Sequence, residues 1–162
     1  MYVTSDNLPD DTRIWIYQAN RQFTEDEIKS IGEDARLFLE GWTAHNNALK
    51  AGFEIRYKRF LILMVDEKSS GASGCSIDKS VHFIKSLEKK FAVDFFDRMR
   101  FAYKTEGRVE AVQKSEFEKL YSTGVLNDDS IVFNNLVESK QQLSNGWEIP
   151  LKNSWHRSFL VS

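Results

Sequence analysis

Residues 61–78, LILMVDEKSSGASGCSID, constrain the fold of this chain more than any other stretch. An apolar run ends in Asp66 and Glu67, a loop of small residues carries the only cysteine, and a helix is expected to follow. A strand, a small-residue loop and a helix start in this order expose backbone N–H groups at the positive end of a helix dipole. The sequence therefore predicts an anion site formed by Gly71, Ser73, Gly74, Cys75 and Ser76.

The composition indicates a chain with a core of its own. Of the 162 residues, 41% are hydrophobic and 28% are charged, which is typical of one compact domain. The net charge of -2 argues against a generic surface for nucleic acid or anionic membranes. The longest apolar run, 60–65, is far shorter than the roughly 20 residues of a membrane-spanning helix. Since the first residues also lack the features of a secretion signal, the sequence predicts a cytoplasmic protein without membrane association.

Hydrophobic periodicity predicts the first half of the chain in some detail. Residues 13–18 alternate as a strand does, and Thr24 and Glu27 form a capping box that opens a helix ending near Gly41. Residues 51–66 predict either a hairpin or a single long bent strand, because the pair Lys58-Arg59 is a poor turn sequence. Ser76 is the expected N-cap of the next helix.

The second half of the chain continues the alternation of strands and helices. A hairpin is expected around Gly107, a third helix is expected to open at Ser115, and a strand covers 131–133. The order predicts a single α+β domain over 1–162, with a mixed or antiparallel sheet covered by helices and with ferredoxin-like or split βαβ elements. Residues 145–162 are aromatic but unperiodic, so we expect an extended tail packed on the body.

Several segments resemble a known family. They read IWIYQAN, FTEDEI, GWTAH, FEIRYKRF, SGCSIDKSVHFI, FFDRM, IVFNNLV and SWHRSFL. The chain is similar over nearly its whole length to a family of small uncharacterised bacterial proteins that are often called ABC transporter ATPases. The resemblance implies a family and no activity. ATP hydrolysis of that kind needs a G-x-x-x-x-G-K-[ST] loop, and no Gly-Lys pair occurs in this sequence, so we do not expect it.

Cys75 is the residue of the small-residue loop that suits covalent chemistry. A thiol in the first turn of a helix is stabilised as the thiolate, which favours a nucleophile or a redox sensor. The candidate bases are His45 and His156, because His82 lies two helical turns from the sulfur. The alternative is a small cysteine that fills a tight loop. The three histidines show no ligand spacing, so no metal is predicted, and the sequence requires no cofactor.

Three functions stay open at this point. The favoured one is a non-catalytic cytosolic binding or interaction module, in which loop 71–76 holds a small anionic ligand or a carboxylate of a partner protein. The second is an enzyme with Cys75 as nucleophile, His45 or His156 as base, and the loop amides as an oxyanion hole. The third is a structural homo-oligomer whose aromatic residues, 13% of the chain, form the interface.

Overall fold

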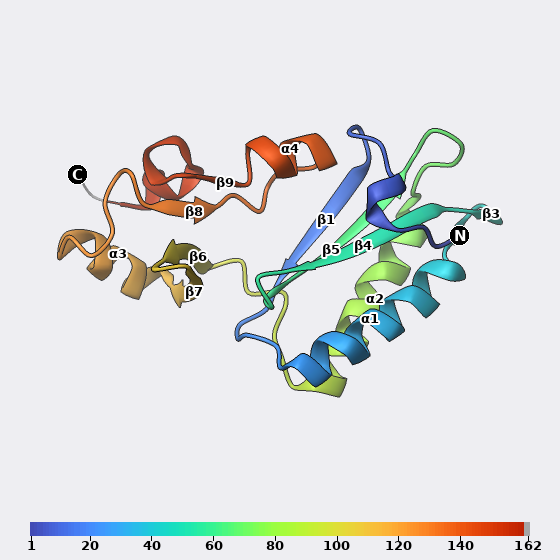
Figure 1. The fold of residues 1–162 in the computed structure, drawn as a ribbon, viewed down its shortest axis with the longest axis horizontal. Coiled ribbons are helices and arrows are strands. Elements are labelled where there is room, and N and C mark those ends of the chain that lie inside the picture. The colour runs from blue at the N-terminus through green and yellow to red at the C-terminus, as the bar shows by residue number, and fades with distance from the viewer. Residues whose placement is uncertain (161–162) are drawn as a thin grey trace. The chain divides into compact units, whose positions relative to one another are not determined.

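The computed structural model describes residues 1–160, and it confirms the predicted α+β class (Figure 1). The ladders between the named strands are antiparallel. Within residues 1–160, no helix combines the length and the hydropathy that crossing a bilayer requires. With 3-10 helices marked η, the elements are η1 (Ser5–Asn7), β1 (Arg13–Gln18), α1 (Glu25–Glu40), β2 (Thr43–Ala44), β3 (Asn47–Ala48), β4 (Lys50–Arg56), β5 (Phe60–Asp66), α2 (Gly74–Phe91), β6 (Arg100–Thr105), β7 (Arg108–Gln113), α3 (Lys114–Ser122), β8 (Ile131–Phe133), α4 (Lys140–Asn145), β9 (Glu148–Pro150), η2 (Leu151–Asn153) and η3 (Trp155–Phe159).

The described chain divides into two compact units. Unit 1 contains Met1–Phe96 together with Glu138–Gln141. Unit 2 contains Asp97–Val137 together with the described residues from Gln142 onward. Each unit has a sheet and a core of its own, so each is described by itself. The single domain expected across 1–162 stays a prediction.

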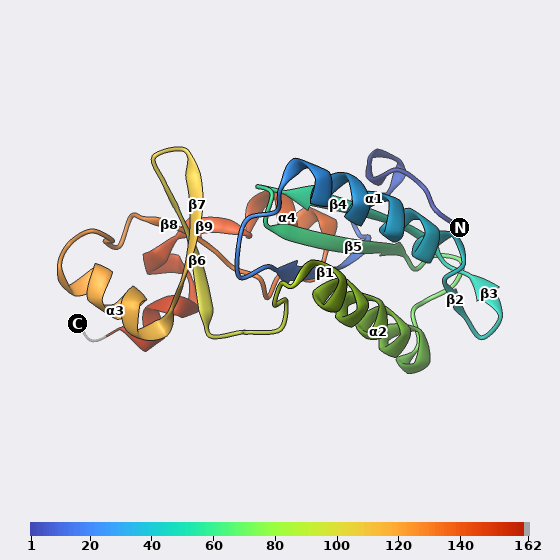
Figure 2. The same cartoon turned by 90° about the horizontal axis from the view of Figure 1, so that it is seen from below.

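The larger sheet of unit 1 has the strand order β1-β5-β4, and β2 and β3 form a separate two-stranded sheet. The strands β1 and β4 run parallel to each other with β5 inserted antiparallel between them, and α1 connects them. This is the split βαβ arrangement that the sequence predicts. Figures 1 and 2 show α1 and α2 on the same face of this sheet. On the outer edge of β1, the N–H of Ile14 donates to Glu138 O, where a fourth ferredoxin-like strand would lie.

The hairpin is the observed alternative for residues 51–66. Tyr57 and Lys58 both adopt the left-handed region, with φ of 54° and 52°, and form the tight turn between β4 and β5. Non-glycine residues adopt this region at a cost, so the turn needs support from elsewhere. The N–H groups of Phe23 and Ala19 provide it by donating to Lys58 O at 2.6 Å and to Arg59 O at 2.8 Å.

The core of unit 1 lies between the sheet and its two helices. Alternate residues of each strand face the helices, because successive side chains of a strand point to opposite sides. The indole N–H of Trp42 donates to Ser76 O at 2.9 Å, which joins the chain after α1 to the first turn of α2. The buried members of this core are Tyr17, Ala19, Phe23, Ile31, Leu39, Trp42, Ala44, Leu49, Ala51, Leu61, Leu63, Val65, Ile84, Leu87, Val93 and Phe95.

Unit 2 has a four-stranded sheet of order β7-β6-β8-β9 with α3 packed on it. Its buried core contains Phe101, Tyr103, Phe117, Leu126, Val132, Leu151 and Leu160. The expectation of an extended tail over 145–162 needs correction for its described part. That part contains β9 and two 3-10 helices. The sequence did not indicate them, because such short elements show no helical or strand periodicity.

Candidate functional site

The loop before α2 supplies most of its own hydrogen-bond acceptors. The helix begins at Gly74 with Ser73 as N-cap, three residues earlier than predicted, because Ser73 and Ser76 form a reciprocal capping box. The N–H of Ser73 donates to Ser76 Oγ at 2.6 Å, and the N–H of Ser76 donates to Ser73 Oγ at 3.2 Å. The N–H of Ala72 donates to Glu67 Oε2 at 2.9 Å. A carboxylate of the protein itself therefore lies against this loop, and a bound anion would face its charge.

Three of the five predicted loop residues lie open to solvent, whereas Ser73 is half-buried and Ser76 is buried. Gly71, Gly74 and Cys75 are exposed, and a Cβ added to Gly74 would meet no heavy atom within 4 Å. The loop is thus neither a closed cradle nor a place of close backbone approach. No second feature of the described residues points to a ligand there, so the anion site stays a prediction.

Two of the catalytic candidates, Cys75 and His45, belong to unit 1, and the third, His156, belongs to unit 2. Cys75 is exposed in the first turn of α2. His45 is exposed in the turn between β2 and β3, with φ of 50°. Among the described residues of unit 1, no hydrogen bond joins the Cys75 sulfur to the imidazole of His45. Within residues 1–160 there is also no group of three or more histidine, cysteine or acidic side chains placed to hold a metal ion.

His156 belongs to unit 2 and is 2% exposed. Ser154 Oγ and His156 Nδ1 lie 2.6 Å apart, and the imidazole stacks on Trp155 with ring centroids 3.8 Å apart. Burial lowers the pKa of His156 to about 4, because the charged imidazolium loses its hydration. His156 is therefore neutral at physiological pH and packs as part of an aromatic core.

Unit 1 contains a groove that the sequence did not indicate. It encloses about 440 Å³ between α1 and the edge strand β4. Its half-buried floor is apolar, and its exposed rim is charged on the α1 side. The lining residues, called the α1–β4 groove below, are Ile28, Lys29, Gly32, Glu33, Arg36, Phe53, Glu54 and Ile55.

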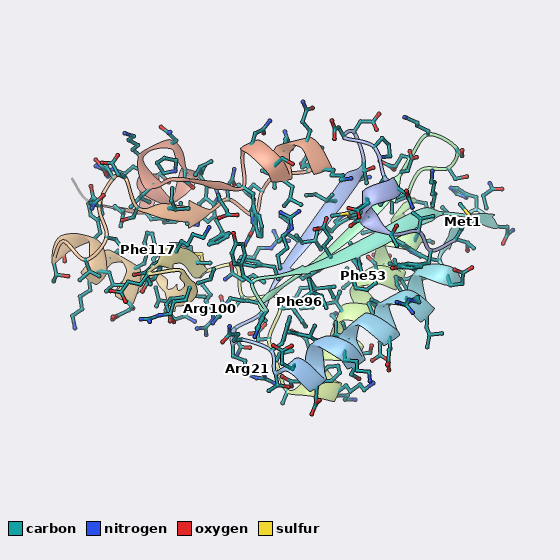
Figure 3. All side chains as sticks on the ribbon, viewed as in Figure 1. Met1, Arg21, Phe53, Phe96, Arg100 and Phe117 are labelled. Atoms are coloured by element: carbon teal, nitrogen blue, oxygen red, sulfur yellow. The ribbon has the colours of Figure 1, made fainter. Side chains whose placement is uncertain are left out.

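The groove exists because α1 has a glycine where it passes β4. A Cβ added to Gly32 would lie 3.7 Å from Phe53 Cζ, so the missing side chain leaves the ring of Phe53 uncovered there. Figure 3 shows Phe53 between β4 and α1. One end of the groove is bounded by Tyr2, whose ring centroid lies 5.9 Å from that of Phe53 and 5.5 Å from Arg36 Cζ.

The groove carries charges of both signs. Lys29 and Arg36 contribute two positive charges, and Glu33 and Glu54 contribute two negative charges. Glu54 is already paired, since it accepts from Arg56 Nε at 2.9 Å. An apolar floor with a few polar groups at its rim is the usual chemistry of a binding site.

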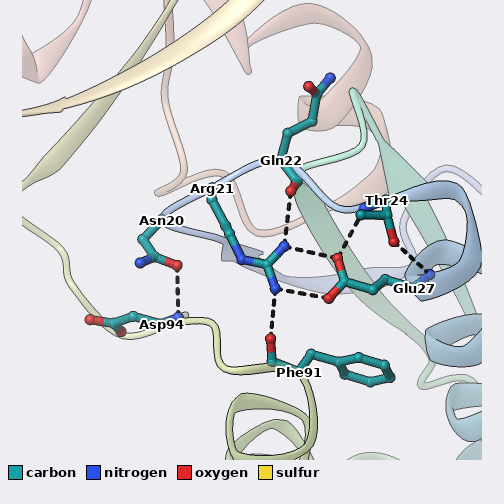
Figure 4. Close-up of polar contacts among 7 residues, drawn as sticks. All are labelled: Asn20, Arg21, Gln22, Thr24, Glu27, Phe91 and Asp94. Atoms are coloured by element: carbon teal, nitrogen blue, oxygen red, sulfur yellow. Dashed lines mark hydrogen bonds and ion pairs between the residues drawn. The ribbon is translucent and has the colours of Figure 1, made fainter.

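A polar cluster around Arg21 and Glu27 links the two helices of unit 1 and has a structural role (Figure 4). Arg21 donates through both Nη atoms to the Glu27 carboxylate at 2.8 Å and through Nη2 to Phe91 O at 2.6 Å. Glu27 Oε1 also accepts from the N–H of Thr24 at 2.9 Å. The bond from Arg21 is the largest cause that lowers the pKa of Glu27 to about 2. The cluster ties the start of α1 to the end of α2.

Comparison with known proteins adds no family to these observations. No family model, no curated protein and no solved structure matches the chain. The resemblance to the family called ABC transporter ATPases therefore stays a prediction.

Proposed function

We propose that the protein is a non-catalytic, cytoplasmic binding module that holds its ligand in the α1–β4 groove. The observation that carries this proposal is the groove itself, in which the half-buried Ile28, Phe53 and Ile55 form an apolar floor beside exposed charges. Burying such a floor beneath a ligand is favourable, at about 25 cal/mol per Å² of apolar surface.

The groove favours binding over covalent chemistry. Its lining contains no cysteine, serine, threonine or histidine. The cysteine-based alternative would need a base near Cys75. The side chain that bonds to loop 71–76 from outside it is the carboxylate of Glu67, which accepts from the N–H of Ala72, and not an imidazole. The free cysteine is compatible with the reducing cytoplasm that the proposal assumes.

The test uses anilinonaphthalene sulfonate, a dye with an apolar body and one anionic group. We expect it to shift the backbone amide NMR signals of the α1–β4 groove in the wild-type protein. Gly32→Leu should remove these shifts, because its side chain would fill the floor against Phe53. Gly41→Leu is the matched control, because it adds the same side chain at the C-cap of α1, where a Cβ would meet no heavy atom within 4 Å.

Two outcomes would contradict the proposal. Shifts confined to the amides of 71–76 would favour the predicted anion site instead. Groove shifts that persist in Gly32→Leu would show that the dye does not occupy the floor.

A further inference from the structure

The edge of β4 already accepts an extended segment of this chain. The strand lies at the end of the order β1-β5-β4, so one side of its backbone faces away from the sheet. The N–H of Ala51 donates to Met1 O at 3.0 Å, and Ala51 O accepts from the N–H of Val3 at 2.8 Å. Tyr2 and Ala51 thus form a parallel bridge on the outer edge. This edge is geometrically able to take an added strand.

The added segment covers only the first part of the edge. At Gly52 a Cβ would lie 2.7 Å from Val3 O, so the segment crosses the face of β4 there and leaves the edge. Outward and inward backbone groups alternate along a strand, and Ala51 points outward, so Phe53 and Ile55 do as well. In residues 1–160, no hydrogen bond from another segment reaches the outward N–H and C=O groups of these two residues.

The α1–β4 groove lies beside this unpaired part of the edge. Phe53 and Ile55 point toward α1, as do Leu61 and Leu63, their partners in the β4–β5 ladder. Side chains at alternate positions of an added strand would point the same way and enter the groove. The intervening side chains would lie on the opposite face. The apolar floor of the groove favours apolar side chains at the positions that enter it.

We propose that the groove and the edge of β4 together bind an extended segment of a partner protein, with apolar residues at alternate positions, as a strand added to the sheet. This inference rests on the proposed function and states how the ligand binds. Backbone hydrogen bonds to Phe53 and Ile55 supply affinity, and the groove selects the alternate side chains.

The direct test uses a short synthetic peptide of alternating valine and threonine with blocked ends and terminal lysines for solubility. Two further peptides are N-methylated, one at its valines and the other at its threonines. Only one of these two sets of N–H groups can face β4. We therefore expect the unmodified peptide and one methylated peptide to bind, and the other methylated peptide to lose about tenfold or more in affinity.

The pattern of loss decides the outcome. With the valines in the groove, a loss of affinity on methylating the valines identifies an antiparallel added strand. A loss of affinity on methylating the threonines identifies a parallel one. Equal binding of all three peptides would overturn strand addition, as would equal loss by both methylated peptides. Absence of peptide binding would also overturn it. If the dye still maps to the groove in that case, the proposed function stands without its strand-addition mode.

Two protein variants complete the test. Ile55→Pro removes an outward N–H and no ladder hydrogen bond to β5, so it should abolish peptide binding, whereas Ile55→Val should retain it. If Ile55→Pro does not fold, Gly32→Leu against Gly41→Leu makes the same comparison through the groove. A concentration-dependent dimer that Ile55→Pro dissociates would overturn the proposal, because a second copy would then be the occupant of the edge.

Discussion

Arg21 and Glu27 form a two-point ion pair, with both Nη–Oε distances at 2.8 Å. Glu27 belongs to the capping box of α1, and the same guanidinium donates to Phe91 O at the last residue of α2. One carboxylate therefore stabilises a helix start and the contact between two helices.

Glu27→Gln should lower the free energy of unfolding by about 1–2 kcal/mol at neutral pH. The figure is discounted for solvent screening, because the Arg21 side chain is 38% exposed. The Glu27 pKa of about 2 lies below its ordinary value of 4.5, so its stabilisation is present above that value and is lost as pH falls from 4.5 to 2. Urea unfolding across this range should show a smaller loss in the variant than in the wild type. Glu33→Gln, on the exposed rim, is the control and should behave as wild type.

His156 should make unit 2 sensitive to mild acid. Its pKa of about 4 lies below the ordinary 6.5, so the folded state binds fewer protons and its stability falls as pH drops from 6.5 to 4. The full loss is about 3 kcal/mol. Imidazole NMR titration together with unfolding of unit 2 checks this. A His156 imidazole that titrates near 6.5 in the folded protein would contradict the buried, neutral state.

Gly32→Ala should stabilise unit 1 by about 1 kcal/mol. The new methyl group would make ordinary contact with Phe53 at 3.7 Å, and a helix gains from alanine in place of glycine. Gly107→Ala is the opposite case, because Gly107 has φ of 79° and alanine there is strained. Thermal unfolding of the two variants should therefore move in opposite directions.

Cys75→Ser should change the free energy of unfolding by less than about 0.5 kcal/mol, because the thiol is exposed in the first turn of α2. The native wild-type protein should react with a disulfide reagent without prior unfolding. A thiol that reacts only in denaturant would contradict the exposed position.

The elements with local signals were predictable from the sequence. The capping box of Thr24 and Glu27 placed the start of α1, and alternation placed β1. The start of α2 was wrong by three residues, because Ser73 and Ser76 are both competent caps and bond to each other. The sequence does not decide between a hairpin and a single long strand at the β4–β5 turn, because the turn is supported by the distant backbone of Ala19 and Phe23.

The groove was not predictable in the same way. It joins Gly32 on α1 to Phe53 on β4, and it depends on a side chain that Gly32 does not have. A glycine inside a helical pattern is a weak local signal whose meaning appears only with its tertiary neighbour. The small-residue loop was the stronger sequence pattern, but its own serines and Glu67 satisfy several of its amides.

The most direct test of the account is an NMR map of contacts between isotope-labelled protein and the unmodified valine–threonine peptide. The account predicts intermolecular contacts from the peptide to the Phe53 and Ile55 backbone and to Ile28 and Gly32 on α1. Contacts confined to 71–76, or to residues outside the α1–β4 groove, would contradict it.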